Sequence, residues 1–261
     1  MATPSVQIQM DGGVAVLTLD DIARKNAMSP ELGDALKARV AELKTDASVR
    51  AVVLTGAGGS FSAGGDLAML ERLQQSSFAD ARQFMREFYG RYLSLLDLEV
   101  PLVSAIEGPA IGAGLCVALA ADVVYVAEDA KLALNFVQLG LHPGMGATYL
   151  VPRKVGAQRA AELLFSGRRF DGREARSMGL ALEAFAPGTV LDKAMTLARQ
   201  WASGGPIAVR ALKKALGVNR AALEAALEHE AHSQAQNYGS EDFKEGLRAA
   251  AERRAPKFTG G

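Results

Sequence analysis

Two glycine-rich loops contain the residues of this chain that are best suited to chemistry. The first reads Phe61-Ser62-Ala63-Gly64-Gly65-Asp66, and the second reads Gly108-Pro109-Ala110-Ile111-Gly112-Ala113-Gly114. Each loop follows a strand-like apolar run and precedes a helix-like segment, so each can present backbone N–H groups that have no partner inside a helix. Two such loops brought together predict an oxyanion hole, in which preorganised N–H donors stabilise the negative charge of an enolate.

The segments around these loops alternate between predicted strands and predicted helices. Strands are expected at residues 6–10 and 14–19, joined as a hairpin by a glycine turn, and at 51–54, 102–106 and 123–126. A helix is expected to begin at Ser29-Pro30, where serine can cap it and proline suits its first position. Further helices are expected over 84–96, 110–121 and 220–236. This order predicts an α/β architecture with largely buried strands.

The two loops, in the sequences FSAGGDL and AIEGPAIGAG, resemble the paired oxyanion motifs of the crotonase superfamily, the enoyl-CoA hydratase/isomerase family. Other stretches that match in order are RKNAM from residue 24, LGLHPG from 139, SGRRF from 166 with residues 175–180, and EDFKEG from 241 leading to RAPKF from 254. The resemblance covers nearly the whole chain. It implies a crotonase-like ββα spiral core with the acyl-CoA site in residues 1–186, and a C-terminal helical oligomerisation region in residues 187–261.

The resemblance also implies an acyl-CoA-processing enzyme that works as a trimer or a dimer of trimers. Its oxyanion donors are then the backbone N–H groups of Gly65 and Ala113, and the helix that begins at Ala113 adds its positive N-terminal dipole. A plain strand-to-helix turn at Gly65 and a small residue for close packing at Ala113 are the alternative interpretations.

Coenzyme A is expected as part of the substrate, and no permanently bound cofactor is expected. The resemblance assigns its binding to Arg24, Lys25, Ala27, Ala63, Asp66 and Leu67, and to Lys257 and Phe258 reaching across from an adjacent subunit. Solvated surface charge is the alternative for Arg24 and Lys25, and a frayed tail is the alternative for Lys257 and Phe258.

The acid and base positions depart from the family pattern. Hydratases of this family use two glutamates, and the matching positions here hold Cys116 and Phe136. Phenylalanine has no transferable proton, and a cysteine in an apolar helix keeps a raised pKa. Some family isomerases place an acid after the proline that is Pro143 here, but Gly144 occupies that position.

Three side chains remain as candidates for proton transfer, and each has a plainer interpretation. Histidine titrates near neutral pH, yet for His142 a hydrogen-bonded side chain at a helix entry is favoured over a catalytic role. Tyr89 can donate a proton or simply pack. Glu71 is the carboxylate nearest in sequence to the first loop, and a surface carboxylate is its default interpretation.

Other chemistries have weaker support in the sequence. Cys116 has no histidine placed beside it by sequence, so a small buried apolar group is favoured over a nucleophile. His229 and His232 share a helix face, but no third ligand follows and no metal site is predicted. Gly112-Ala113-Gly114 lacks the third glycine of a dinucleotide fingerprint, since Val117 occupies that position, so an NAD-dependent oxidoreductase ranks low. No glycine loop continues into the Gly-Lys-Ser/Thr of a phosphate-binding loop.

Composition narrows the function classes further. The 261 residues hold 29 Lys and Arg against 29 Asp and Glu, so no general attraction to nucleic acid or to an anionic membrane is predicted. The single cysteine forms no internal disulfide, and the first ten residues lack the pattern of a secretory signal, so we expect a cytoplasmic protein. Hydration, isomerisation and other enolate reactions remain open, and an acyl-CoA-binding homologue without turnover is the competing class.

Overall fold

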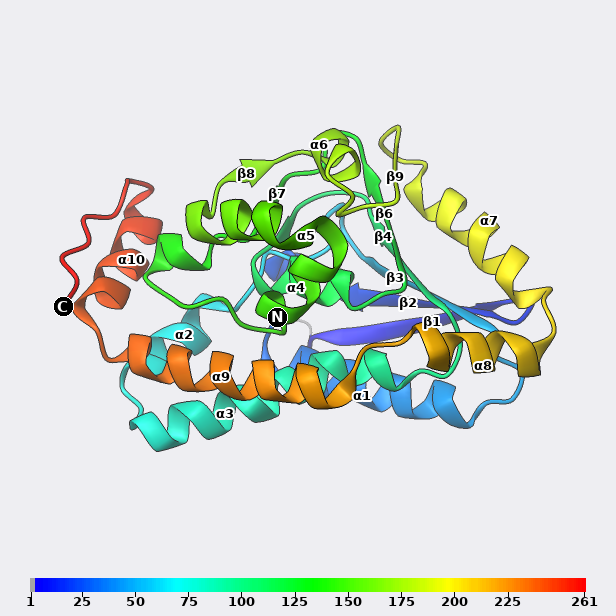
Figure 1. The fold of residues 1–261 in the computed structure, drawn as a ribbon, viewed down its shortest axis with the longest axis horizontal. Helices are drawn as coiled ribbons and strands as arrows, with labels where there is room; N and C mark the ends of the chain where they lie inside the picture. Colours follow the sequence, from blue (N-terminus) through cyan, green and yellow to red (C-terminus); the bar gives the residue numbers. More distant parts are fainter. Residues whose placement is uncertain (1–2) are drawn as a thin grey trace.

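The strands of the computed structural model, which describes residues 3–261, form two sheets (Figure 1). The larger sheet has the order β1-β2-β3-β4-β6-β9, with β1 and β2 antiparallel and all other neighbours parallel. Its strands are β1 (Ser5–Asp11), β2 (Val14–Asp20), β3 (Ala51–Gly56), β4 (Leu102–Ile106), β6 (Val123–Ala127) and β9 (Glu183–Phe185). The smaller sheet joins β5 (Ala110–Ile111), β7 (Leu132–Ala133) and β8 (Arg169–Phe170).

Helices connect and cover these strands. The α-helices are α1 (Pro30–Thr45), α2 (Leu67–Gln74), α3 (Phe78–Tyr92), α4 (Ala113–Leu119), α5 (Ala147–Ser166), α6 (Gly172–Ser177), α7 (Val190–Ala202), α8 (Pro206–Leu216), α9 (Arg220–Tyr238) and α10 (Glu241–Glu252). Short 3₁₀ helices are η1 (Ile22–Arg24), η2 (Leu93–Asp97) and η3 (Phe136–Leu139). The mixed α/β architecture predicted from the sequence is confirmed.

Local signals explain where several of these elements begin. Gly12 and Gly13 adopt positive φ angles of 57° and 87°, which lets them form the tight turn of the predicted β1-β2 hairpin. The Ser29 hydroxyl accepts a hydrogen bond from the N–H of Leu32, and Pro30 is the first residue of α1. Strands β3 and β4 are buried almost throughout, as their continuous apolar runs predict for a parallel sheet.

The apolar stretch at 110–121 differs from its predicted form. Instead of one buried helix, it contains the short strand β5 followed by α4. Gly112 separates them, because its φ of 53° and ψ of −122° are incompatible with a helix. This break gives Ala113 the first position of α4, at the end of the helix where backbone N–H groups are unpaired.

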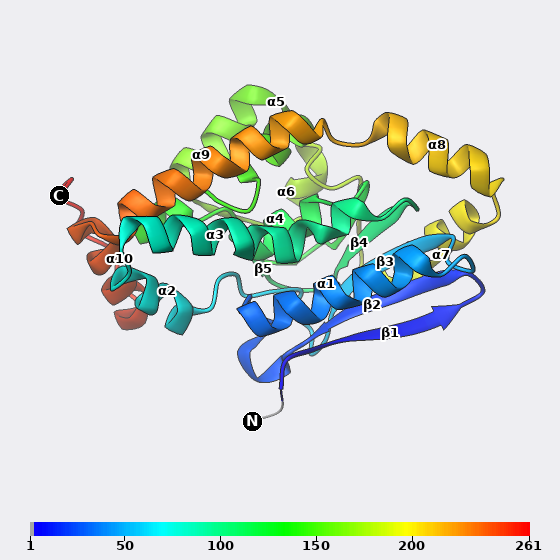
Figure 2. The ribbon, with the colours of Figure 1, turned by 90° about the horizontal axis from the view of Figure 1, so that it is seen from below.

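The C-terminal helices pack around the rest of the chain. Figure 2 shows α3 and α9 running side by side, and α7 packs on β3 and β4. In Figure 1, α10 and the C-terminus lie at the opposite end of the molecule from α7 and α8. A division between residues 1–186 and 187–261 stays a prediction.

Candidate active site

A buried asparagine fixes the first glycine loop to the segment that precedes α1. The Asn26 side chain is fully buried and donates to the carbonyls of Ala57 and Ser60 at 3.0 and 2.7 Å. The backbone carbonyl of Asn26 accepts a hydrogen bond from the Ser62 hydroxyl at 2.7 Å. The N–H of Met28 then donates to the carbonyl of Gly64 at 2.8 Å. Asn26 therefore determines where the backbone from Ser62 to Gly65 runs.

The second loop lies directly on the first. The N–H of Ile111 donates to the carbonyl of Ser62 at 3.0 Å. A Cβ on Gly64 would fall 2.7 Å from the carbonyl oxygen of Ile111, and one on Gly114 would fall 2.6 Å from the Ser62 side chain. Gly64 also has a φ of 91°, which side chains rarely tolerate. The glycines at these two positions are therefore required for the loops to meet.

The contact between the loops places Gly65 and Ala113 in the wall of one cavity. Within residues 3–261, no acceptor takes the backbone N–H of either residue. The parallel bridge between Met28 and Gly65 uses the neighbouring carbonyl of Gly64 and N–H of Asp66, which leaves the Gly65 N–H free. Two unpaired donors on one wall can hold a single oxygen that develops negative charge.

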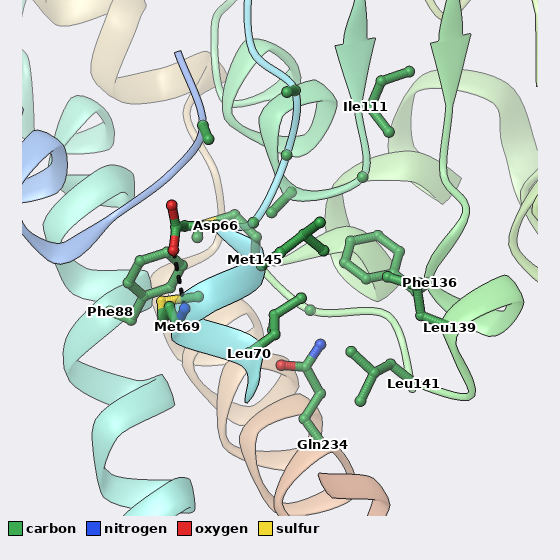
Figure 3. Close-up of a pocket in the computed structure, with 18 of the residues that line it drawn as sticks. Asp66, Met69, Leu70, Phe88, Ile111, Phe136, Leu139, Leu141, Met145 and Gln234 are labelled. Atoms are coloured by element: carbon green, nitrogen blue, oxygen red, sulfur yellow. Dashed lines mark hydrogen bonds between the residues drawn. The ribbon is translucent and has the colours of Figure 1, made fainter. Parts of the chain in front are cut away.

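The cavity is a mostly apolar hollow of about 420 Å³. Its wall comes from the two loops, from α2, α3 and η3, and from the segment before α5, closed by residues of α9 and α10 (Figure 3). Apolar side chains that face it include Met69, Leu70, Phe88, Leu139, Leu141 and Met145. A concave apolar site with few polar groups is typical of small-molecule binding.

The two positions where the resemblance expects glutamates differ in their surroundings. Phe136 lines the cavity, and its ring lies 4.0 Å from the point where a Cβ on Gly112 would sit. Cys116 is fully buried on α4 and is not part of the cavity wall. Burial raises the pKa of the Cys116 thiol well above its usual range, and the nearby Glu230 carboxylate adds to this effect. The thiol is therefore held in its neutral form.

Tyr89 is the one proton-transfer candidate of the three that lines the cavity. Its hydroxyl donates to Oε1 of Gln234 at 2.9 Å, and the Tyr238 hydroxyl lies 3.2 Å from the same oxygen. Burial raises the pKa of Tyr89 well above its usual value, so the hydroxyl can donate a hydrogen bond or a proton but cannot serve as a base near neutral pH. Gln234 and Tyr238 lie on α9, and sequence reasoning did not identify either of them.

The other two candidates lie outside this cavity. His142 turns its ring toward His229, with ring centroids 5.5 Å apart, and its Nδ1 lies 2.7 Å from the carbonyl of Pro143. Burial lowers the pKa of His142. Glu71 borders a separate, more polar hollow of about 630 Å³ that also includes Arg24 and Arg72. Neither side chain contacts the space beside Gly65 and Ala113.

Most of the residues expected to bind coenzyme A surround the cavity. Arg24, Ala27, Ala63, Asp66 and Leu67 all line it. The Arg24 guanidinium pairs with Asp21 at 2.7 Å and with Asp66 at 3.4 Å.

The other three residues expected to bind coenzyme A do not line the cavity. Lys25 is exposed, but its carbonyl accepts the Ala63 N–H at 2.9 Å and so supports the first loop. Lys257 and Phe258 lie away from the cavity of their own chain, on a tail anchored to α10. There the Glu245 carboxylate accepts the backbone N–H of Lys257 at 2.9 Å.

Glu230 is a buried carboxylate that the sequence did not single out. It reaches from α9 to the N-terminus of α5 and accepts hydrogen bonds from the N–H of Gly146 at 2.7 Å and from the N–H and hydroxyl of Thr148 at 2.8 and 2.6 Å. Gly146 is the N-cap of α5 and has no side chain, so Glu230 supplies the missing cap. Burial raises the pKa of Glu230 to about 7 against the effect of these hydrogen bonds.

Two further features concern other classes of site. Across the described part of the chain, no group of three or more His, Cys, Asp or Glu side chains is arranged to hold a metal ion. His232 packs edge-on against Phe78, whereas His229 packs against His142, so the two histidines of the predicted shared face have different neighbours. Of the helices in residues 3–261, none has the length and apolar character needed to cross a bilayer.

Known proteins are similar to this chain in sequence and in fold. The sequence model of the enoyl-CoA hydratase/isomerase family matches residues 9–261. The chain belongs to this family. A Thermus thermophilus relative named as a candidate enoyl-CoA hydratase is 37% identical, over 97% of this chain and 100% of its own. Human mitochondrial methylglutaconyl-CoA hydratase is 36% identical, over 95% of this chain and 74% of its own.

Solved structures of the enoyl-CoA hydratase/isomerase family agree with this assignment. The crystal structure of an enoyl-CoA hydratase/isomerase from Pseudoalteromonas atlantica superposes with a TM-score of 0.85 at 33% identity, covering 98% of this chain and 100% of the other. The protein therefore has the crotonase fold and is an enzyme of the hydratase/isomerase type. The family assignment replaces the oxidoreductase alternative.

Proposed function

We propose that this enoyl-CoA hydratase/isomerase family member binds an acyl-CoA thioester and stabilises its enolate through the backbone N–H groups of Gly65 and Ala113. The observation that carries the proposal is that two unpaired N–H groups, from loops about fifty residues apart, line one apolar cavity. Preorganised donors of this kind act on the charge that develops during reaction and need no reorganisation. The relatives named for CoA thioesters support the same substrate class.

The proton transfer in this proposal does not use a pair of carboxylates. Phe136 and the buried Cys116 stand where the resemblance expects glutamates, and no carboxylate other than Asp66 is part of the described cavity wall. Asp66 caps α2 through the N–H of Met69 and pairs with Arg24, so its oxygens are already engaged. Tyr89 is then the side chain placed to deliver a proton: its raised pKa keeps the hydroxyl protonated near neutral pH, although it also makes that hydroxyl a weak acid.

An acyl-CoA-binding homologue without turnover is the second candidate. The absence of glutamates at positions 116 and 136 favours this second candidate, because no residue of the described cavity wall is a free carboxylate or histidine that could act as a base. The two candidates share the binding site and differ only in proton transfer.

Two measurements on the purified protein test the proposal. Calorimetry should show saturable binding of butyryl-CoA, and failure of a folded sample to bind it would overturn both candidates. Consumption of crotonyl-CoA should be at least about a hundredfold slower than with a hydratase that has both glutamates, since acid–base groups contribute about 10²–10⁴-fold. The assigned role of Tyr89 would be contradicted if the protein hydrated crotonyl-CoA as fast as a hydratase with both glutamates and the Tyr89→Phe variant kept that rate.

Self-association through the C-terminal helices is a further part of the proposal. Ile207, Leu212 and Leu216 on α8 are 86%, 58% and 71% exposed, a run of apolar side chains that monomers rarely leave in water. A second copy covering this face would give the trimer or dimer of trimers expected from the resemblance. Light scattering after size exclusion should give a mass of three or six chains, and a monomer mass would overturn this part. The cytoplasmic location stays a prediction.

A further inference from the structure

The amide of Gln234 is a polar group set into the apolar part of the cavity. Its side chain is 3% exposed and lines the cavity. Figure 3 shows it reaching from α9 between Leu70 and Leu141, with its amide directed toward the middle of the space. Apart from the hydroxyls of Tyr89 and Tyr238, the cavity wall around this amide is apolar, so the amide is not explained by general surface polarity.

The hydrogen bonds of Gln234 establish which of its two amide atoms faces which neighbour. One amide atom lies 2.8 Å from the carbonyl of His142, which can only accept a hydrogen bond, so that atom is the Nε2 donor. Oε1 is then the acceptor for the hydroxyls of Tyr89 and Tyr238. The neighbours therefore leave no freedom to exchange the two atoms.

One proton of this amide remains without a partner. Nε2 carries two protons, and the carbonyl of His142 is its single acceptor among residues 3–261. Nε2 also lies 2.6 Å from the point where a Cβ on Gly144 would sit, so glycine at 144 keeps the amide accessible. Buried polar groups are generally paired, so an unpaired N–H that faces a binding cavity indicates an acceptor on the ligand.

The charges around the cavity limit what that acceptor can be. Arg24 is the one cationic residue in the described wall, and it already pairs with Asp21 and Asp66. Burial and Glu230 raise the pKa of Tyr89, and Arg86 lowers it. Arg86 is already ion-paired with Glu224 and Glu228, so it offers no free counter-charge to an anion beside the amide. A carboxylate placed there would lose its hydration without gaining a counter-charge.

The geometry points to a substrate whose acyl group carries a neutral oxygen, as a hydroxyl or a ketone, that accepts the free Nε2 proton of Gln234. This inference rests on the proposed function, since it assumes an acyl-CoA in the cavity. The Tyr89 hydroxyl, which lies against the same face of Gly144, can accept the proton of a substrate hydroxyl at the same place. Gln234 is thereby a specificity-determining residue for the acyl chain.

Calorimetric binding of a series of CoA thioesters to the purified protein tests the inference. The series compares hexanoyl-CoA with chains of equal length bearing a hydroxyl or ketone at C4, C5 or C6, and with adipoyl-CoA, which ends in a carboxylate. We expect one neutral oxygenated chain to bind about tenfold more tightly than hexanoyl-CoA, as one additional hydrogen bond provides. Adipoyl-CoA should bind no more tightly than hexanoyl-CoA.

Two leucine variants on the same helix provide the comparison. Gln234→Leu should reduce the tenfold preference to less than about twofold while hexanoyl-CoA still binds. The matched control, Gln236→Leu, changes an exposed glutamine of α9 and should keep the full preference. Preference retained in Gln234→Leu would overturn the inference.

The wild-type series decides the question even if Gln234→Leu does not fold. Equal binding of every neutral chain, or tightest binding of adipoyl-CoA, would overturn the inference while leaving the proposed function intact. Failure of all the thioesters to bind would overturn the proposed function and the inference together.

Discussion

The hydroxyl of Tyr89 lies 2.6 Å from the point where a Cβ on Gly144 would sit. Nε2 of Gln234 is equally close to that point. The tyrosine and the glutamine therefore occupy the space that any side chain at position 144 would need. An acid at this position, which the resemblance associates with some isomerases, cannot be accommodated beside Tyr89 and Gln234 as they stand.

Gly144→Ala tests this steric relationship. We expect it to lower the free energy of unfolding by about 1–3 kcal/mol, because an added methyl group must displace two buried, hydrogen-bonded side chains. Urea unfolding gives the value. Gly90→Ala is the matched control, since Gly90 lies in the last turn of α3 and a Cβ there meets nothing within 4 Å, and it should be neutral or stabilising. Equal stability of both variants would show that Tyr89 and Gln234 move aside freely.

Gly64→Ala tests the contact between the two loops. The new Cβ would meet the carbonyl oxygen of Ile111 at 2.7 Å and would also require an unfavourable φ of 91°. We expect a loss of more than about 2 kcal/mol in stability and at least about tenfold weaker binding of butyryl-CoA.

Gly59→Ala separates the two causes in that experiment. Gly59 has a φ of 71° but open space around its Cβ position, so this variant should lose only the 1–2 kcal/mol of backbone strain and should bind butyryl-CoA normally. If Gly64→Ala binds as well as Gly59→Ala, close contact between the loops is not needed for the site.

Each part of the site that the sequence predicted lies within one short segment of the chain. Gly64, Gly65 and Ala113 were identifiable because each belongs to a loop with its own recognisable glycine pattern. The α/β order was likewise predictable from buried apolar runs and from the cap at Ser29. The short strand β5 before Gly112 was not predicted, because a continuous apolar run conceals a change from strand to helix.

Gln234 and Glu230 were not predicted for a different reason. Both lie on α9, whose pattern is that of an ordinary amphipathic helix, and their partners Tyr89 and Gly146 are far away in sequence. No local spacing indicates that one helix face will close a cavity while also capping another helix. Conversely, His142 was a candidate because of its position in sequence, and its ring contacts His229 rather than the cavity.

Cys116→Glu tests whether a glutamate can be restored at the first position that the resemblance indicates. Cys116 is fully buried next to the Glu230 carboxylate, so a second carboxylate would be desolvated and repelled. We expect a loss of about 3 kcal/mol or more in stability, against about 1–2 kcal/mol for the control Cys116→Ser. Thermal unfolding measures both. A stable Cys116→Glu protein would mean that α4 can turn this position toward the cavity.

Glu230 should make stability depend on pH. Its pKa is about 7 in the folded protein against 4.5 as its ordinary value, so the folded state binds the proton more tightly. The corresponding stabilisation is complete below about pH 4.5 and is lost as pH rises toward 7, by up to about 3 kcal/mol. Urea unfolding at pH 5, 6, 7 and 8 should show this decline.

Glu230→Gln provides the comparison for that decline. The variant should be less stable overall, because an amide N–H of glutamine then faces a backbone N–H of Gly146 or Thr148. Glutamine cannot titrate, so the stability of the variant should change less between pH 5 and 7. The same slope in both proteins would assign the pH dependence to other groups.

The most direct test of the oxyanion hole is the enolate absorbance of bound acetoacetyl-CoA in wild type, Ala113→Pro and Ala113→Gly. Proline removes the N–H at the first position of a helix, where it is well tolerated, and glycine keeps that N–H. Wild type and Ala113→Gly should show the enolate at a pH well below that at which the free thioester ionises, and folded Ala113→Pro should require a higher pH. If Ala113→Pro binds acetoacetyl-CoA with the same enolate fraction as wild type, the Ala113 N–H does not stabilise the enolate and is not part of an oxyanion hole.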